Sequence, residues 1–366
     1  MSLARQLKLA ALEAANRTGI AALFGSSSWR QSRLLILCWH GISLDDEHVW
    51  NPGLYITEQQ FRSRLQILRD LRCNVIGLEE GLTRLREGTL PPRSVVLTVD
   101  DGSYDFYLRG FPAVRNYGFP LTIYLTTYYS EYNRPVFDTM ASYLLWKAGR
   151  SGRTLVWPEL LQNRAELADE GQRNQADRQI KAYALQHRLS GGQKDALLEQ
   201  LASRLQINYS DLCCRRLLHL VTPREARAMS EAGIDLELHT HRHRVYLEQE
   251  YFHAELDDNI TRIRAIAPHA NPKHFCYTGG FYAPEFPTIL RNYGLKSATT
   301  CELGLATAES NPFLLPRLLD HANLSDTEFR SWLMGVADLF PRRQYPMTEG
   351  QLMKPNWNSA PDKASA

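Results

Sequence analysis

The sequence lacks long apolar runs, blocks of like charge and closely spaced cysteine pairs. No apolar stretch approaches the roughly 18 residues that span a bilayer, so we expect no transmembrane helix. Lys and Arg number 42 against 40 Asp and Glu. This balance excludes the excess of positive charge on which electrostatic nucleic-acid binding depends. The six cysteines show no CxxC spacing and include the adjacent pair Cys213 and Cys214, so reduced thiols are expected rather than a disulfide framework.

The first 30 residues lack the uninterrupted apolar core of a signal peptide, because Glu13, Asn16 and Arg17 interrupt it. This absence favours a cytoplasmic protein, with the inner face of the membrane as the place of any lipid contact. Residues 1–30 are predicted to form an amphipathic helix that packs on the domain, and weak membrane-surface contact is the alternative. Its predicted apolar face carries Leu3, Leu7, Ala10, Ala11 and Ala14.

Strand-like apolar runs alternate with amphipathic helical stretches along residues 31–340. Strands are predicted at 33–42, 94–100 and 120–127, and helices at 57–72, with Thr57 as cap, and at 105–118, ending at Gly118. This alternation indicates an α/β fold with a parallel sheet or barrel. Residues of about 135–220 lack a convincing strand and are interpreted as a helical insertion, and residues 341–366 as a loosely ordered tail.

Two carboxylates, Asp100 and Asp101, follow directly on the uncharged strand residues of "SVVLTV". Parallel sheets and barrels bind ligands at the carboxyl ends of their strands. Neighbouring carboxylates repel each other unless a cation lies beside them or one is protonated. One Asp would suffice to cap the following helix, which is the alternative explanation. The pair favours a functional site.

Histidines cluster in "GIDLELHTHRH", where a second strand-like segment ends in His239, His241 and His243. Two imidazoles and a carboxylate form a metal site that leaves positions for water and substrate. If the segment stayed extended, all three rings would share one face. The spacing does not decide which two bind metal, and a solvated His/Arg loop is the alternative.

The motifs "TVDDG" and "HTHRH" together resemble the first two motifs of the polysaccharide deacetylases, the NodB-like carbohydrate esterases of family 4. The resemblance implies a distorted (β/α) barrel in which Asp100 is the general base. It further implies that Asp101, His239 and His243 hold a divalent metal, with zinc expected. His241 then takes a variable position between the ligands.

The segment "HFCYTGGFYAPEF" resembles the third-motif region of the exopolysaccharide-deacetylase branch. The resemblance implies that the backbone around Tyr277 and Gly279 contacts the substrate and supplies an oxyanion donor. Many family members carry, at the place of Cys276, an arginine that orients the base. Arg317, in "LLPRLLD", resembles the "LPR" of that branch and is predicted to substitute for it.

His40 ends the strand-like run "LILCWH", which resembles the N-terminal strand of the same branch, where the catalytic histidine has moved to the start of the barrel. The resemblance therefore implies that His40 is the general acid; a buried structural histidine is the alternative. His321 lies near the place of the usual C-terminal motif but offers no convincing copy of it. The other histidines outside the cluster offer no comparable context: His48, His187, His219, His253, His269 and His274.

The resemblance implies metal-dependent removal of N-acetyl groups from amino sugars in a polysaccharide or glycan precursor. Hydrolysis of another C–N bond, such as a formamide or cyclic amide, is one alternative. A carbohydrate-binding relative without turnover is the other, because the third motif is altered. The expected partner is an N-acetylated glycan.

Overall fold

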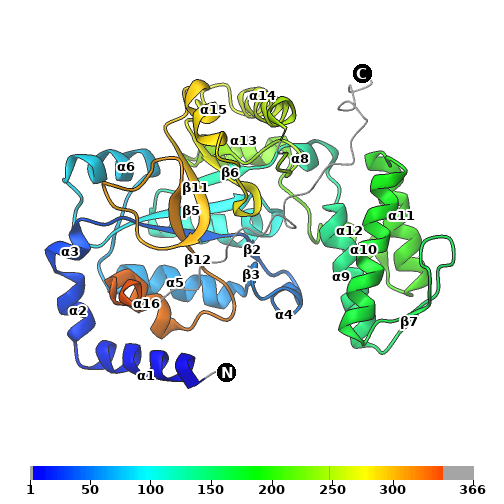
Figure 1. Cartoon of the computed structure of the whole chain (residues 1–366), viewed down its shortest axis with the longest axis horizontal. Helices are drawn as coiled ribbons and strands as arrows, with labels where there is room; N and C mark the ends of the chain where they lie inside the picture. Colours follow the sequence, from blue (N-terminus) through cyan, green and yellow to red (C-terminus); the bar gives the residue numbers. More distant parts are fainter. Residues whose placement is uncertain (1–2, 247, 341–366) are drawn as a thin grey trace.

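The computed structural model describes residues 3–246 and 248–340 (Figure 1). Seven parallel strands close into a barrel in the order β1-β12-β11-β10-β9-β6-β5, and β5 pairs back to β1. The strands are β1 (Leu35–Trp39), β5 (Ser94–Asp101), β6 (Thr122–Leu125), β9 (Asp235–Leu238), β10 (His274–Cys276), β11 (Ser297–Leu303) and β12 (Leu315–Leu319). The predicted distorted (β/α) barrel is confirmed.

The distortion is concentrated at β5, the longest strand. One edge of β5 pairs with β1 from Val95 to Val99. Its other edge pairs first with the short strand β4 (Asn74–Val75) at residues 94–95 and then with β6 at residues 98–101. Pairing with β1 ends at Val99, so β6 alone pairs with Asp100 and Asp101, the two carboxylate residues at the end of β5.

Helices follow the strands, as the alternating pattern predicts. Thr57 caps α5 (Glu58–Asp70) with a capping box, as expected. The predicted helix at 105–118 is divided into a π-helical turn, η1 (Phe106–Gly110), and α7 (Phe111–Tyr117), and Gly118 ends it at φ 66°. The remaining helices around the barrel are α6 (Leu78–Glu87), α13 (Pro223–Glu231), α14 (Gln249–Ile266), α15 (Phe286–Asn292), α16 (Asp326–Met334) and the 3-10 turn η3 (Val336–Leu339). The run at 33–42 forms two strands, β1 and then β2 (Gly41–Ile42). The helix α4 (Glu47–Trp50) follows β2 and precedes β3 (Tyr55–Ile56), and β2 and β3 pair with each other.

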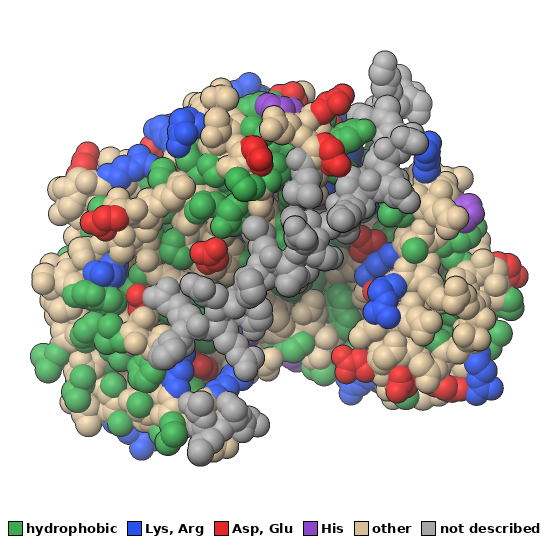
Figure 2. Space-filling view, viewed as in Figure 1, with side chains coloured by type: hydrophobic (Ala, Val, Ile, Leu, Met, Phe, Trp, Pro, Cys, Tyr) green, Lys and Arg blue, Asp and Glu red, His purple; other side chains and the backbone are tan. Residues whose placement is uncertain are grey.

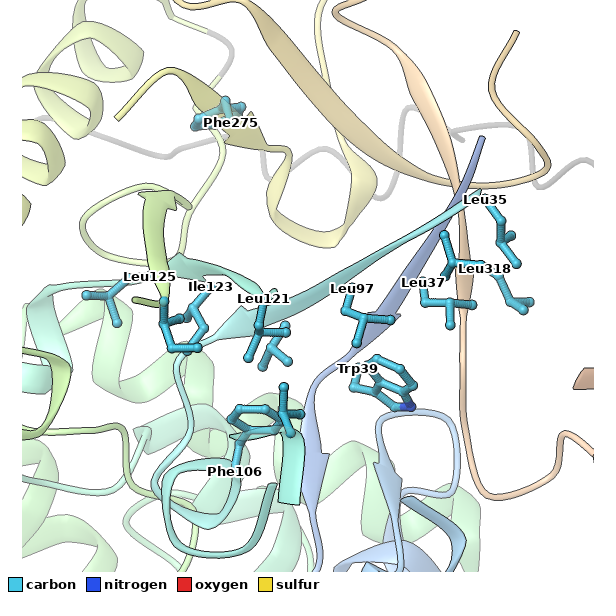
Figure 3. Packing of buried hydrophobic residues seen from close by; sticks show 14 of the residues in the cluster. Leu35, Leu37, Trp39, Leu97, Phe106, Leu121, Ile123, Leu125, Phe275 and Leu318 are labelled. Atoms are coloured by element: carbon cyan, nitrogen blue, oxygen red, sulfur yellow. The ribbon is translucent and has the colours of Figure 1, made fainter. Parts of the chain in front are cut away.

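Alternate strand residues build two separate cores. Leu37, Leu97 and Leu318 face the surrounding helices, and Figure 3 shows them close to Trp39. The intervening residues point into the barrel, because residues from β1, β5, β6, β10 and β12 share one cluster: Ile36, Val96, Tyr124, Cys276 and Leu315. Leu78, Leu82 and Leu85 of α6 complete this inner cluster. Asp100 lies an even number of residues after Val96 on β5, and Arg317 lies two residues after Leu315 on β12. The side chains of Asp100 and Arg317 therefore also point into the barrel.

The N-terminal segment packs on the domain through a face other than the predicted one. It forms three helices, α1 (Leu3–Arg17), α2 (Ile20–Gly25) and α3 (Ser28–Gln31). Leu12 is fully buried, and Asn16 donates hydrogen bonds to Thr327 O and Ser331 Oγ on α16, at 3.2 and 3.1 Å. The predicted apolar face is wrong, since four of its members are exposed: Leu7, Ala10, Ala11 and Ala14. Polar contacts with α16 select the docked face, and apolar spacing alone does not reveal them.

The insertion forms a helical lobe beside the barrel, at the right of Figure 1. Its elements are α8 (Tyr128–Tyr132), α9 (Phe137–Arg150), α10 (Glu170–Gln186), α11 (Gly191–Arg204) and α12 (Tyr209–Cys214). A two-stranded sheet of β7 (Thr154–Leu155) and β8 (Ala165–Glu166) is an addition to the expected helices. The lobe packs around its own apolar cluster, which includes Met140, Leu144 and Leu201. The predicted domain boundaries themselves stay predictions, and the predicted tail at 341–366 lies outside the described residues.

The described surface carries both signs of charge. On the face in Figure 2, Lys and Arg side chains alternate with Asp and Glu over the barrel and the insertion. Within residues 3–246 and 248–340, no helix combines the length and the apolar character that crossing a membrane requires.

Candidate active site

Asp100 and Asp101 point in different directions from the end of β5. Asp100 belongs to the barrel interior and is 1% exposed. Asp101 leaves the regular strand conformation with a φ of 69°, and Gly102 follows at 78°. The chain thus turns at the carboxyl end of the strand, and the two adjacent carboxylates enter different surroundings.

Arg317 holds Asp100 with two parallel hydrogen bonds. Nη1 donates to Asp100 Oδ1 and Nη2 to Oδ2, both at 2.8 Å, and Nε donates to Thr300 O. Burial would raise the pKa of Asp100, but the charge and hydrogen bonds of Arg317 lower it well below its usual range. The contact predicted for Arg317 is present, and it keeps Asp100 ionised and fixed in orientation.

Cys276 leaves room for this guanidinium. Its Sγ lies 3.1 Å from Arg317 Nη2 and 3.4 Å from Asp100 Oδ2. The resemblance implied that an arginine usually stands at position 276, on β10. In this chain the arginine comes from β12 instead and reaches the same carboxylate across the barrel interior.

Asp101, His239 and His243 form a cluster of convergent donor atoms. Asp101 Oδ1 lies 3.1 Å from His239 Nε2 and 3.0 Å from His243 Nε2. His239 Nδ1 donates to Cys276 O at 2.9 Å, so Nε2 is the nitrogen that faces the cluster and would ligate a metal. Asp101 Oδ1 is buried and forms no hydrogen bond within the described chain. Two imidazoles and one carboxylate with an unsatisfied oxygen fit a divalent metal ion.

Left-handed backbone conformations recur around the cluster at residues other than glycine. Asp101 has a φ of 69°, Thr240 of 61° and His243 of 56°. Such conformations cost free energy and persist where the surrounding structure imposes them. Two of the three candidate ligands are therefore held in conformations that the chain does not adopt without support.

Helix α14 supplies part of that support. Asn259 is fully buried, accepts from His239 N–H at 3.0 Å and donates to Leu125 O and Thr127 Oγ1. Glu255 accepts from the backbone N–H and the guanidinium of Arg242. Sequence reasoning missed Asn259 and Glu255, because each lies more than ten residues along the chain from the loop that it holds.

His241 faces away from the cluster. Its Nδ1 lies 2.8 Å from Thr127 Oγ1, and burial lowers its pKa to about 4. The extended segment in which all three rings share a face is therefore not formed. The strand ends at Leu238, and the left-handed turns at Thr240 and His243 separate the middle ring from its neighbours.

Replacing His241 by Gln is expected to leave metal binding unchanged while lowering the free energy of unfolding by about 1–3 kcal/mol, because a buried hydrogen bond is lost. His239→Gln is the matched comparison and should lose the metal. Metal stoichiometry and urea unfolding of both variants test this. Loss of metal from His241→Gln at unchanged stability would contradict the assignment.

His40 lies where the sequence predicts, directly after β1. Its Nε2 is 3.7 Å from Asp100 Oδ2. Burial lowers the pKa of His40, against the opposing charges of Asp100 and Asp101. Asp105 ties this loop to the one after β5, since its Oδ1 accepts from Ile42 N–H at 2.9 Å and from Ser103 Oγ at 2.6 Å. Burial raises the pKa of Asp105 to about 7.

The third-motif segment meets the site through its turn and not through Tyr277. The ring of Tyr277 is 1% exposed within the apolar core, and its N–H donates to Thr299 O. Core packing thus takes the side chain of Tyr277, and its predicted place at the substrate, which concerned the backbone, stays a prediction. Thr278 Oγ1 contacts Thr240 Oγ1 at 3.3 Å, and Gly279 follows at φ 60°. The predicted Gly279 thus adjoins the loop that carries the histidines.

A pocket of about 460 Å³ of open space lies beside the donor cluster. Asp101 and His243 line it together with Ser103, Asp105 and Thr126 of the barrel loops. Its remaining wall comes from Tyr55 and from residues of the insertion and its flanks: Tyr129, Val136, Thr139, Leu218, His219 and Leu220. The sequence around His219 carries no other site residue, so only the fold brings this histidine to the pocket.

A parallel seven-stranded barrel with its polar cluster at the strand ends is the NodB-type deacetylase fold. The deacetylase PplD of Streptococcus pyogenes, whose structure was determined in complex with acetate, superposes with a TM-score of 0.54 at 17% identity, over 84% of this chain and 99% of that one. IcaB from Ammonifex degensii superposes with a TM-score of 0.52 at 16% identity, over 82% and 97%. At these identities the likeness concerns the fold.

Residues 87–298, more than half of the chain, match the sequence model of the family described as polysaccharide deacetylase. The chain therefore belongs to the polysaccharide deacetylase family, a family of hydrolases. A poly-β-1,6-N-acetyl-D-glucosamine N-deacetylase of Staphylococcus epidermidis is 32% identical over 72 residues. That match spans 20% of this chain and 25% of the relative.

Proposed function

We propose that this protein is a metal-dependent deacetylase that hydrolyses N-acetyl groups of amino sugars in a polysaccharide or glycan precursor. One observation carries the proposal: an arginine-held, ionised Asp100 lies in sequence and space beside the Asp101–His239–His243 cluster. A fixed base next to a metal site is what amide hydrolysis by water requires.

Asp101 Oδ1, His239 Nε2 and His243 Nε2 would hold the metal, for which we propose zinc. When bound, the ion supplies a Lewis acid that polarises the acetyl carbonyl and lowers the pKa of water. The His239 Nδ1–H bond to Cys276 O fixes the tautomer that ligation needs.

Asp100 acts as the general base in this proposal. The bidentate contact with Arg317 keeps it ionised and aims it, and its neighbour Asp101 belongs to the donor cluster. Asp100 takes a proton from water as the water oxygen bonds to the acetyl carbon. The N–H of Gly279, within the turn Thr278–Gly280 that contacts the histidine loop, is the proposed donor to the resulting oxyanion.

His40 acts as the general acid. It stands 3.7 Å from Asp100, whose negative charge opposes the effect of burial and favours the protonated imidazolium that this role needs. When the C–N bond breaks, His40 protonates the leaving amine. One water is consumed, and the products are acetate and a free amino sugar.

The exopolysaccharide-deacetylase branch is the proposed place of this chain within the family. The motif arrangement supports it, with the histidine at the start of the barrel and arginine on β12. The name of the Staphylococcus epidermidis relative supports an N-acetylglucosamine polymer as the substrate class. The alternative of a binding protein without turnover rested on the missing arginine at position 276, and the Arg317–Asp100 pair weakens that argument.

The test measures acetate and free amine released from N-acetylglucosamine oligomers by the zinc-loaded chain. We expect equal amounts of the two products, loss of activity after chelation and its return on adding zinc. Metal analysis of each sample is the control.

Full activity of a metal-free sample would overturn the proposal. Tight oligomer binding without acetate would favour the binding protein. Release of formate from an N-formyl sugar, or opening of a cyclic amide, without acetate release from the oligomers would favour hydrolysis of another C–N bond.

A further inference from the structure

We propose that His219, at the root of the helical insertion, binds the substrate glycan by accepting a hydrogen bond from a sugar hydroxyl at Nε2. The inference rests on the proposed function and adds a residue that determines how the glycan is bound. His219 lies outside the motifs by which the family is recognised.

The backbone places His219 against the chain that follows the two carboxylates. Tyr104 N–H donates to His219 O, and Val221 N–H donates to Gly102 O, both at 2.9 Å. Ser103 and Leu220 form an antiparallel bridge between these bonds. The end of the insertion thus pairs with the residues that come directly after Asp101.

The start of the insertion holds the same segment from its other side. Pro135 and His219 form a second antiparallel bridge, and Val136 N–H donates to Leu218 O at 3.0 Å. The segment from Leu218 to Val221 therefore lies between two paired neighbours. A ring carried by such a segment has a fixed position relative to Asp101.

The ring itself presents an acceptor. Nδ1 lies 2.9 Å from Leu217 O, and because a carbonyl oxygen only accepts, Nδ1 carries the proton. Burial lowers the pKa of His219 to about 4, so the ring is neutral near pH 7 and Nε2 keeps its lone pair. Across residues 3–246 and 248–340, no group forms a hydrogen bond with this nitrogen.

His219 is 97% buried, yet it lines the pocket that Asp101 and His243 share. A neutral imidazole with only a lone pair to offer binds a donor and disfavours a carboxylate or phosphate oxygen. Among glycan groups near an acetamide, the donors are hydroxyls, so His219 favours a neutral sugar with a free hydroxyl at this place.

The experiment compares zinc-loaded wild type with three full-length variants on N-acetylglucosamine oligomers. His219→Leu removes the acceptor at similar volume, and His219→Gln restores one. His187→Leu is the matched control, because His187 is also in the insertion and also has Nδ1 near a backbone carbonyl, but is exposed and lies away from this pocket. Metal stoichiometry and melting temperature are measured for each.

We expect His219→Leu to raise KM about five- to tenfold and to leave kcat within about twofold of wild type, because one neutral hydrogen bond to the substrate is lost. His219→Gln should recover most of this, and His187→Leu should match wild type. An unchanged KM in His219→Leu would overturn the inference. So would equal KM increases in both His219 variants together with lowered melting temperatures, because they would indicate a structural role.

Failure of the proposed function gives a different result. If wild type releases no acetate, binding of the same oligomers to all four proteins is measured by calorimetry. If His219→Leu alone binds the oligomers more weakly, His219 contacts the glycan even though the protein does not deacetylate it. Equal binding by all four, or none, would overturn the subsite as well.

Discussion

Replacing Asp101 by Ala is expected to abolish metal binding and to lower acetate release by on the order of 10³-fold or more. Asp101 Oδ1 is the point at which the two imidazoles converge, at 3.1 and 3.0 Å. Without it two neutral rings remain, one of them on a partly exposed loop residue, His243. The lost stabilisation of the transition state by the ion is worth several kcal/mol, and about 4 kcal/mol corresponds to this factor.

Zinc content after equilibrium dialysis, read beside acetate release, measures the effect. The matched pair is Asp101→Asn and Asp105→Asn, the same change at two carboxyls that line one pocket. Asp105 contacts Ile42 N–H and Ser103 Oγ and stands outside the donor cluster, and its raised pKa makes a neutral side chain tolerable. Asp105→Asn should therefore keep its zinc. A metal-free, fully active Asp101→Ala protein would refute the scheme.

Replacing Arg317 by Met is expected to lower the free energy of unfolding by about 3–5 kcal/mol at neutral pH and to remove activity. The change leaves Asp100 buried as an unpaired charge, and such a break is far costlier than the loss of an exposed ion pair. Both partners are essentially inaccessible to solvent, at 0% and 2% side-chain exposure. Urea unfolding and acetate release measure the two effects.

The pH dependence of this loss has a definite sign. In wild type the pKa of Asp100 is lowered, so its stabilising contribution is present above the unfolded-state pKa and declines as pH falls through the folded value. In Arg317→Met, the charge and hydrogen bonds that most strongly oppose burial are gone, so the pKa of Asp100 is higher than in wild type. The difference in stability between the two proteins should therefore shrink in acid.

A double variant separates the structural from the catalytic role. Arg317→Met with Asp100→Asn removes both charges and should be more stable than Arg317→Met alone, yet inactive. Arg317→Lys, which keeps the charge and loses the parallel pair of donors, should fall between wild type and Arg317→Met. Arg317→Met with wild-type stability and activity would show that the pair has neither role.

The sequence located the candidate site from residues that are close along the chain. Asp100 and Asp101 interrupt an apolar run at its end, and His239 and His243 do so on another strand. Because carboxyl ends of parallel strands meet at one end of a barrel, these short motifs suffice to predict that the four residues gather there. The motif around Arg317 identified it as a candidate residue. Its contact with Asp100 depends on the barrel, which brings β5 and β12 together.

Other features could not be predicted, since they depend on contacts between distant segments. His241 has the same spacing as its neighbours, but its orientation follows from left-handed turns and from Thr127, 114 residues away. The side chain of Tyr277 packs in the core, which the motif around it does not reveal. The buried face of α1 is selected by Asn16 and its partners on α16.

The sequence by itself determined the alternation of strands and helices and the residue types at the strand ends, because local periodicity and turn chemistry record them. The tertiary structure alone decided which groups meet: Arg317 with Asp100 across the barrel interior, Asn259 with the backbone of His239, and His219 with Asp101 in the lining of one pocket. Closing the barrel and pairing the two ends of the insertion impose these distances. No local pattern carries them, since the partners lie up to 217 residues apart.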